Sequence, residues 1–183
     1  MELELVKSCE RCSLRKKCNN VVVDNYQQKS KAMLICTSPS SSDDIMGEPL
    51  TGVEGEYLTK LLNLSGMERS DFYITNTVKC YTKEKISEKN IEDCKSWLWL
   101  ELKSLQPCVI ITMGLVPTRL LLKTKKSISL SKYVDLSFNV PYIKSSIYPW
   151  YDIKFLLNNG KELEEKTVNF LKKVKNEINN SIS

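Results

Sequence analysis

The chain has 183 residues, of which 42% are hydrophobic and 27% charged, a balance typical of one globular domain with its own core. It contains no histidine, which excludes histidine general bases, Ser-His and Cys-His nucleophile pairs and histidine-containing metal sites. No apolar run approaches the roughly 18 to 20 residues that cross a bilayer, and the first residues are acidic where a secretory signal would be basic and then apolar. We therefore expect a single domain over residues 1–183, located in the cytoplasm and without a membrane partner.

The formal net charge of +5 is unevenly distributed. Residues 120–183 hold 11 Lys against 6 acidic residues, whereas residues 1–119 balance at 16 basic and 16 acidic residues. The lysine excess is compatible with a solvated surface or with a face that binds phosphate groups.

Cysteine is the most informative residue type in the composition. Seven cysteines are many for a cytoplasmic domain, and an odd number argues against a complete set of disulfides. The chain opens with Cys9-x-x-Cys12, a spacing that lets two thiolates converge on one metal centre. Such a centre needs two further ligands.

Hydrophobic patterns along the chain alternate between strands and helices. Strands are predicted over 31–36, 72–77, 108–113 and 140–147, and 21–23 reads as a short β-like run. Amphipathic helices are predicted over 56–64, 88–105 and 161–178, with a short helix around Pro117. Loops are predicted over 37–44, 123–131 and 148–154. This order predicts an α/β fold with a parallel sheet covered by helices on both faces.

The stretch from Gly47 to Cys80 combines features of a ligand site. A glycine-rich loop enters a helix, and the strand that follows delivers Asn76 and Cys80 at its carboxyl end. Such a place is where α/β proteins bind ligands. Cys94 lies on the apolar stripe of the next helix, so it can converge with Cys80.

Several short motifs then recur in a specific order. They are the early C-x-x-C, L-I-x-x-x-P, G-x-P-L-x-G-x-x-G, Y-I-T-N-T-V-K-C, V-I-I-T-M-G and Y-P-x-Y. In this order and spacing the chain resembles, over nearly its whole length, the uracil-DNA glycosylase superfamily and within it the iron–sulfur family 4 type. The resemblance implies a three-layer α/β/α sandwich with a central four-stranded, mainly parallel sheet.

The resemblance also implies a [4Fe–4S] cluster of structural role, held by the thiolates of Cys9, Cys12, Cys80 and Cys94. From the residues alone, thiolate ligation suits an iron–sulfur cluster or structural zinc equally well, and unligated core cysteines are the remaining alternative. Three other cysteines are expected to be bystanders: Cys18, Cys36 and Cys108.

The first active-site motif of the family, G-E-x-P-G followed by acidic residues, is altered in this chain. Residues 36–40 read C-T-S-P-S, so that Thr37 replaces the acid. By the resemblance Pro39 contacts the substrate, and Asp43 or Asp44 activates water.

The base-reading and leaving-group positions are also altered in part. Asn76 matches the asparagine whose amide pairs with the edge of a flipped pyrimidine, but Leu50 stands where the family stacks an aromatic ring on the base. Tyr148-Pro149 stands in place of an H-P motif, so a neutral phenol would donate to the leaving group. Beyond it, Trp150 is a candidate wedge or stacking residue, with a packed loop aromatic as the alternative, and we expect Lys154 to contact phosphate.

Three hypotheses follow for the function. The first is a DNA-binding protein that recognises a flipped uracil or modified pyrimidine, with weakened or altered N-glycosidic hydrolysis, because losing one electrostatic contact in such a site typically costs on the order of 10² to 10³ in rate. The second is a catalytically inactive DNA-binding accessory of replication or repair. The third is an iron–sulfur or zinc protein with only architectural likeness. In the first two, the partner is DNA that is single-stranded or carries a flipped base.

Overall fold

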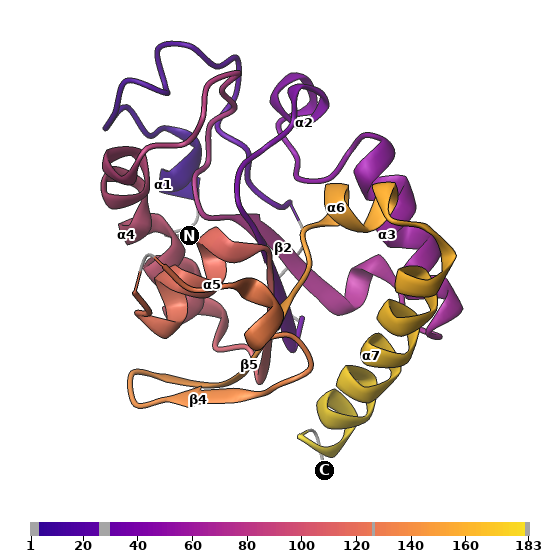
Figure 1. The fold of residues 1–183 in the computed structure, drawn as a ribbon. Coiled ribbons are helices and arrows are strands. Elements are labelled where there is room, and N and C mark those ends of the chain that lie inside the picture. Colours follow the sequence, from indigo (N-terminus) through magenta and orange to yellow (C-terminus); the bar gives the residue numbers. More distant parts are fainter. Residues whose placement is uncertain (1–3, 26–29, 126, 182–183) are drawn as a thin grey trace.

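The chain folds around a five-stranded sheet with the strand order β2-β1-β3-β5-β4 (Figure 1). The structure is a computed structural model that describes residues 4–25, 30–125 and 127–181. The strands are β1 (Ala32–Cys36), β2 (Phe72–Asn76), β3 (Val109–Met113), β4 (Phe138–Val140) and β5 (Ile143–Trp150). All neighbouring pairs are parallel except β4 and β5. The predicted α/β fold with a mainly parallel sheet is confirmed, with one more strand than the predicted four.

The extra strand arises where a single strand over 140–147 was predicted. The segment forms an antiparallel hairpin instead, in which Val140 pairs with Ile143. Pro141 stands at the turn, where its missing N–H removes no ladder hydrogen bond. β5 then continues to Trp150 along β3, so the predicted loop over 148–154 begins three residues later than expected.

Seven α-helices and two short 3₁₀ helices lie within the described residues. They are α1 (Glu4–Lys7), α2 (Ser41–Met46), α3 (Val53–Leu64), η1 (Arg69–Asp71), α4 (Glu88–Leu105), α5 (Leu115–Leu122), η2 (Leu130–Lys132), α6 (Ile153–Asn158) and α7 (Gly160–Asn180). None of the helices described is long and apolar enough to cross a membrane.

The alternation of side chains along the strands creates two apolar layers. On β1, Ala32, Leu34 and Cys36 pack on one face with residues of α3, α6 and α7, whereas Met33 and Ile35 pack on the other with residues of α4 and α5. Figure 1 shows these two groups of helices on opposite sides of the sheet. The fold is therefore a three-layer α/β/α sandwich.

A third apolar cluster attaches the N-terminal segment to the junction between β2 and α4. It contains Val6, Leu14, Val21, Val23, Val78, Cys80, Cys94 and Trp97. The β-like run over 21–23 does not form a strand, although the backbone N–H of Val22 donates to the carbonyl oxygen of Lys79 at 2.8 Å.

A buried ion pair lies beside this junction, between Lys79 after β2 and Glu101 on α4. The two side chains are 1% and 0% exposed, and Nζ lies 2.6 Å from Oε2. Nζ also donates to the carbonyl oxygen of Asn76 at 2.8 Å, and the Glu101 carboxylate accepts from the hydroxyls of Tyr73 and Thr75. These hydrogen bonds satisfy the groups that burial removes from water.

Replacing Lys79 with Met is expected to lower the free energy of unfolding by about 3–5 kcal/mol, because Glu101 would remain as an uncompensated buried charge. Urea denaturation followed by circular dichroism measures the loss. The matched control is Lys17→Met, which removes a surface pair with Glu84 at 2.9 Å and should cost less than about 1 kcal/mol. Equal small losses in both variants would contradict a dependence of the fold on the buried pair.

Candidate functional site

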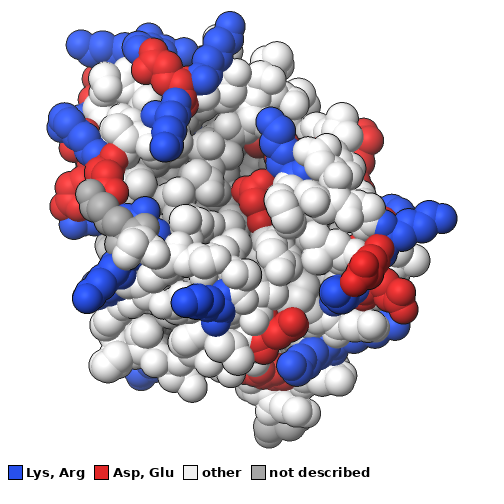
Figure 2. All heavy atoms as spheres, in the orientation of Figure 1, with Lys and Arg blue, Asp and Glu red and all other residues white. Residues whose placement is uncertain are grey.

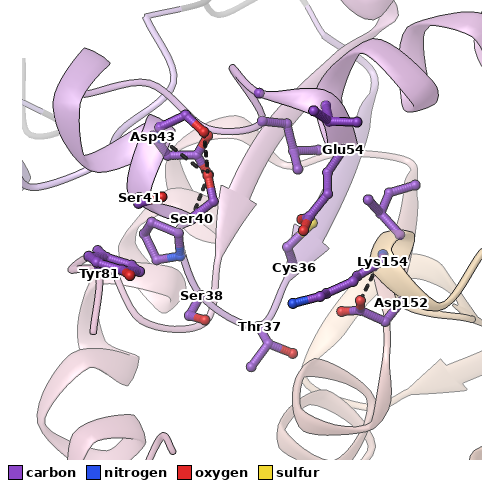
Figure 3. A pocket seen from close by; sticks show the side chains of 16 residues that line it. Cys36, Thr37, Ser38, Ser40, Ser41, Asp43, Glu54, Tyr81, Asp152 and Lys154 are labelled. Atoms are coloured by element: carbon purple, nitrogen blue, oxygen red, sulfur yellow. Dashed lines mark hydrogen bonds between the residues drawn. The ribbon is translucent and has the colours of Figure 1, made fainter. Parts of the chain in front are cut away.

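A cavity of about 450 Å³ opens at the carboxyl end of the sheet. Its walls come from the end of β1 and the loop after it, from α2, from the start of α3, and from the loop and first turn after β5 (Figure 3). The polar side chains facing it include those of Thr37, Ser38, Asp43, Glu54, Tyr81, Asp152 and Lys154. Parallel sheets in α/β proteins bind ligands at this end.

The wall formed by α2 depends on local capping. Residues 37–44 were predicted as loop, but Ser40 caps a short helix: its hydroxyl accepts from the backbone N–H of Asp43, and the Asp43 carboxylate accepts from the N–H of Ser40. This capping box compensates for the poor helix propensity of the serines and aspartates. Asp43 also accepts from the N–H and hydroxyl of Thr51 at 2.8 and 2.9 Å. Asp43 therefore faces the pocket as a fully hydrogen-bonded carboxylate.

The opposite wall requires a close approach of two backbone segments. Leu50 lines the pocket with a left-handed φ of 52°, and Arg69 donates to its carbonyl oxygen and to that of Pro49. A Cβ atom on Gly55 would lie 1.7 Å from the Leu50 carbonyl oxygen. Only glycine at position 55 allows α3 to begin here, and this contact sets the shape of the pocket around Leu50.

Two carboxyl groups that were not predicted to serve a site face the pocket, those of Glu54 and Asp152. Burial, followed by the charge of Asp152, raises the pKa of Glu54. Burial also raises the pKa of Asp152, against the opposing effect of the backbone N–H groups of Lys154 and Phe155. Both groups therefore hold a proton at higher pH than an ordinary carboxyl group does.

Cys36 lies between these acids at the end of β1 (Figure 3). Burial and the nearby charges of Asp152, Glu54 and Asp43 raise the pKa of its thiol well above the ordinary value. Cys36 packs in the core at the end of β1, apart from the cysteines of the N-terminal cluster, and its thiol also lines the pocket. Because its pKa is raised, the Cys36 thiol stays neutral and forms a weakly polar part of the pocket wall.

Asn76 lies beside Cys36, opposite it in the β1–β2 register. Phe72 and Ile74 of the same strand pack on the α3 side of the sheet, so alternation places Asn76 on that side too. The residue is 2% exposed, and its side-chain amide forms no hydrogen bond with any residue that the structure describes. Asn76 is not among the residues that line the pocket, although Cys36, its register partner, is.

Asp44 and Tyr148, which were both expected at the active site, lie elsewhere. The Asp44 carboxylate accepts from the backbone N–H groups of Asn19 and Asn20 and anchors the N-terminal segment. Tyr148 lies within β5, where its hydroxyl donates to Glu177 on α7. It cannot reach the pocket, because its side chain belongs to the apolar layer beneath α7.

Trp150 is also part of the core rather than a DNA wedge. It is 2% exposed, stacks on Phe170 with ring centroids 3.9 Å apart, and donates from Nε1 to Thr167 at 3.2 Å. The exposed aromatic residue of this region is Phe155 on α6, which is 47% exposed and stacks on Tyr151. Because β5 extends through Trp150, the side chain packs in the core, which is the alternative to a wedge at this position.

The surface around the pocket combines both signs of charge. Figure 2 shows acidic side chains at the wall of the central hollow and basic side chains around its edges. Lys154, expected to contact phosphate, lies on α6 and lines the pocket.

The four cysteines expected to bind a metal centre gather in the N-terminal cluster. Cys80 and Cys94 are buried there, and Cys9 and Cys12 pack against them. The indole Nε1 of Trp97 donates to the sulfur of Cys9 at 3.0 Å, and the N–H of Lys79 donates to the sulfur of Cys94 at 3.3 Å.

A fifth thiol, that of Cys18, joins this group. It packs in the same cluster and hydrogen-bonds to Cys80, and burial followed by this contact raises the pKa of the Cys80 thiol. Cys18 was expected to be a bystander, and its proximity to Cys80 was not predicted. All cysteines are free, and among the residues described no three cysteine, aspartate, glutamate or histidine side chains are arranged to hold one metal ion.

Comparison with known proteins supplies the family. Residues 23–179 match the model of the uracil DNA glycosylase superfamily. The chain belongs to that superfamily. It is 33% identical over 170 residues to a type-4 uracil-DNA glycosylase of Saccharolobus solfataricus, covering 87% of this chain and 79% of that protein. A Pyrobaculum aerophilum protein of the same name is 33% identical, covering 66% of this chain and 62% of its own length, and one of Thermotoga maritima is 29% identical, covering 93% of each.

In this chain, Asp152 lies in the loop that follows β5, and its carboxyl group lines the pocket. Tyr148, at the start of the predicted loop over 148–154, was expected in this role instead. A signal was present, because Asp152 precedes the amphipathic segment 153–158 and caps it by accepting from the N–H of Lys154 at 3.0 Å. Glu54 had no comparable signal, since its burial depends on the approach of α6.

The raised pKa values of Glu54 and Asp152 have a consequence for stability. The folded state binds these protons more tightly than the unfolded state, so the contribution to stability is present below the ordinary carboxyl pKa of about 4 and is lost as pH rises through the folded-state value. Both Glu54→Gln and Asp152→Asn are therefore expected to raise the melting temperature at pH 7. This gain should shrink towards pH 4, as measured by thermal unfolding across pH.

The matched control for this prediction is Asp43→Asn. Its carboxylate accepts three hydrogen bonds, one of which the amide cannot accept, so this variant should lose about 1–3 kcal/mol. Destabilisation by all three substitutions at pH 7 would contradict the opposite roles assigned to these acids.

Proposed function

We propose that this chain is a DNA glycosylase of the uracil-DNA glycosylase superfamily that accepts a flipped uracil or modified pyrimidine in the pocket at the carboxyl end of the sheet. The observation that carries the proposal is the pair of acids, Glu54 and Asp152, which face one cavity and whose pKa values are raised by burial. Asn76 is the register partner of Cys36, which lines that cavity. The names of the relatives support the reaction class.

Base recognition is assigned to Asn76, Pro39 and Leu50. The Asn76 amide can donate to and accept from a pyrimidine edge, a pairing worth about 1–3 kcal/mol of discrimination. Pro39 and Leu50 line the pocket. Because Leu50 offers an aliphatic surface where a ring would stack on the base, the pocket has room for a substituent on the pyrimidine. This supports a modified pyrimidine as a substrate alongside uracil.

Glu54 and Asp152 take the catalytic roles for which the altered motifs provide no acid or histidine. Cleavage of the N-glycosidic bond leaves positive charge on the sugar and negative charge on the departing base. Glu54, whose pKa is raised, can donate a proton or a hydrogen bond to the base while protonated. Asp152, when ionised, can stabilise the sugar cation or orient a water molecule, with Asp43 as a second fixed negative charge.

This division of roles predicts weaker catalysis than an imidazolium would give. A carboxylic acid that donates to the base must itself be protonated, and that fraction falls as pH rises through its pKa. Activity should therefore decline towards alkaline pH. The DNA is single-stranded or has a flipped base, because a base within a duplex stack cannot enter a pocket of this kind.

The metal centre proposed for the chain is a [4Fe–4S] cluster bound by Cys9, Cys12, Cys80 and Cys94, with structural zinc as the alternative. The chemistry of the donors suits either group, because four thiols belong to or pack against one apolar cluster, and two of them accept N–H hydrogen bonds of the kind that tune cluster sulfurs. In this structure, however, no three of the described thiols are arranged around one ion. When bound, the group would link the N-terminal segment to β2 and α4. No step of the proposed reaction passes through it.

A base-release assay on single-stranded oligonucleotides tests the proposed function, with uracil and 5-substituted pyrimidines as substrates. Product is expected from the parent chain. Both Asn76→Ala and Asp152→Asn should reduce the rate by on the order of 10² or more, since each removes a contact to the reacting nucleotide. Glu56→Gln, an exposed position two residues from Glu54 on the same helix, should leave the rate unchanged.

Tight DNA binding without any released base, from every oligonucleotide, would overturn the enzyme. That result would favour the DNA-binding accessory. This alternative is supported by two observations: the Asp43 carboxylate already accepts three hydrogen bonds, and the Asp44 carboxylate binds the N-terminal segment.

Metal content tests the proposed centre independently of activity. Protein purified anaerobically is expected to contain iron and to absorb light at about 400 nm, as thiolate-bound clusters do. The Cys94→Ser variant should lose both the iron and the absorbance. Cys108→Ser should retain them, because that thiol packs outside the N-terminal cluster. Stoichiometric zinc without visible absorbance would select the alternative.

A further inference from the structure

A second cavity, of about 470 Å³, opens at the amino end of the sheet. It lies between the second half of α4, the segment that leads into β3 and the start of β5, and it shares no lining residue with the pocket at the carboxyl end. Because β3 and β5 run parallel, the starts of both strands lie at the end of the sheet opposite the proposed active site. A cavity of this size accommodates one small organic ligand.

Two aromatic side chains form the apolar part of this cavity. Trp99 of α4 and Tyr142, which directly precedes β5, both line it, and their rings meet edge to face with centroids 6.0 Å apart. The Tyr142 hydroxyl donates to the carbonyl oxygen of Leu121 at 2.7 Å, and the Nζ of Lys123 lies 3.8 Å from the centre of the tyrosine ring. These contacts hold in place a side chain that is 43% exposed. Aromatic surfaces of this kind stack on flat ligands such as nucleobases.

The polar part of the cavity is basic. Lys103 on α4 and Lys144 on β5 line it and are exposed, and no acidic residue is among the described residues that line it. Neither ammonium group forms an ion pair with a residue that the structure describes. The side-chain amide of Gln106, at the end of α4, adds a hydrogen-bond donor and an acceptor to the same wall. Part of the lysine excess of residues 120–183 therefore borders this cavity.

We propose that this cavity binds one nucleotide, with its base against Trp99 and Tyr142 and its phosphate against Lys103 and Lys144. The nucleotide is either free or one unit of single-stranded DNA, since both present the same base and phosphate. The inference goes beyond the proposed function and needs no catalysis at the carboxyl end of the sheet.

Two simpler ligands fit the cavity less well. An apolar ligand would cover two ammonium groups and an amide without giving them a partner, which is unfavourable. A lone phosphate ion would leave the aromatic surface unused, and exposed charges in water attract it only weakly. A nucleotide satisfies both parts of the cavity, because one sugar joins its flat ring to its negative charge.

Titration calorimetry with deoxyadenosine 5′-monophosphate tests the site, because a purine stacks well and is not the pyrimidine proposed for the other pocket. Trp99→Leu and Tyr142→Leu should each weaken binding at least about fivefold, since each removes a stacking surface. Tyr142→Phe retains the ring and should bind nearly as the parent does.

The charged part of the site has its own variants. The double variant Lys103→Gln, Lys144→Gln should weaken binding and flatten its dependence on salt, because two phosphate contacts are lost. Lys172→Gln, at an exposed lysine of α7 on the opposite side of the sheet, is the matched control and should bind as the parent does. Thermal unfolding shows that each variant folds.

A single-stranded oligodeoxyadenylate is then added as a competitor. Competition for the site would identify a unit of DNA as its ligand, and its absence would identify the free nucleotide. No binding of the monophosphate by the parent chain, equal affinity for inorganic phosphate, or unchanged affinity in both leucine variants would overturn the proposal. Because these probes contain no uracil and no base is released, the result does not depend on the base-release assay.

Discussion

The structure depends on Lys79, whose buried charge holds together segments that are distant in sequence. Its ammonium joins Glu101 of α4 to the carbonyl oxygen of Asn76. Its backbone N–H donates to the sulfur of Cys94, and its carbonyl oxygen accepts from Val22 of the N-terminal segment. A buried charge restricts how the surrounding segments can pack, because each hydrogen bond that is lost leaves a polar group without water or a partner. Lys79 therefore helps to fix both the end of β2 at Asn76 and the sulfur of Cys94.

In the pocket, by contrast with the paired charges of Lys79 and Glu101, acidic groups are partly buried without a hydrogen-bonded cation. Glu54 and Asp152 are removed from water without a fixed cation, which raises their pKa values, whereas Asp43 receives three hydrogen bonds. The first arrangement is unfavourable for folding at neutral pH and useful for proton transfer. Lys154 lines the same cavity, and its charge opposes the effect of burial on the pKa values of both acids.

Much of the fold could be predicted from local pattern. The first three strands and the long helices lie close to their predicted bounds, because apolar periodicity directly reports which side of an element is buried. The failures have specific causes. α2 forms because Ser40 and Asp43 cap each other, which outweighs weak helix propensity. The last predicted strand divides into a hairpin, and β5 extends to Trp150 because its neighbour β3 remains available for pairing.

By itself the sequence determined the family and the strand that carries Asn76, since these are properties of motif order and residue type. Only the tertiary structure decided which acids serve the pocket. Asp44 and Tyr148 are used by the N-terminal segment and by α7, while Glu54 and Asp152, almost 100 residues apart in the chain, face the same cavity. The physical reason is that desolvation and charge coupling depend on which segments pack together, and these contacts are not encoded in the local pattern around any one acid.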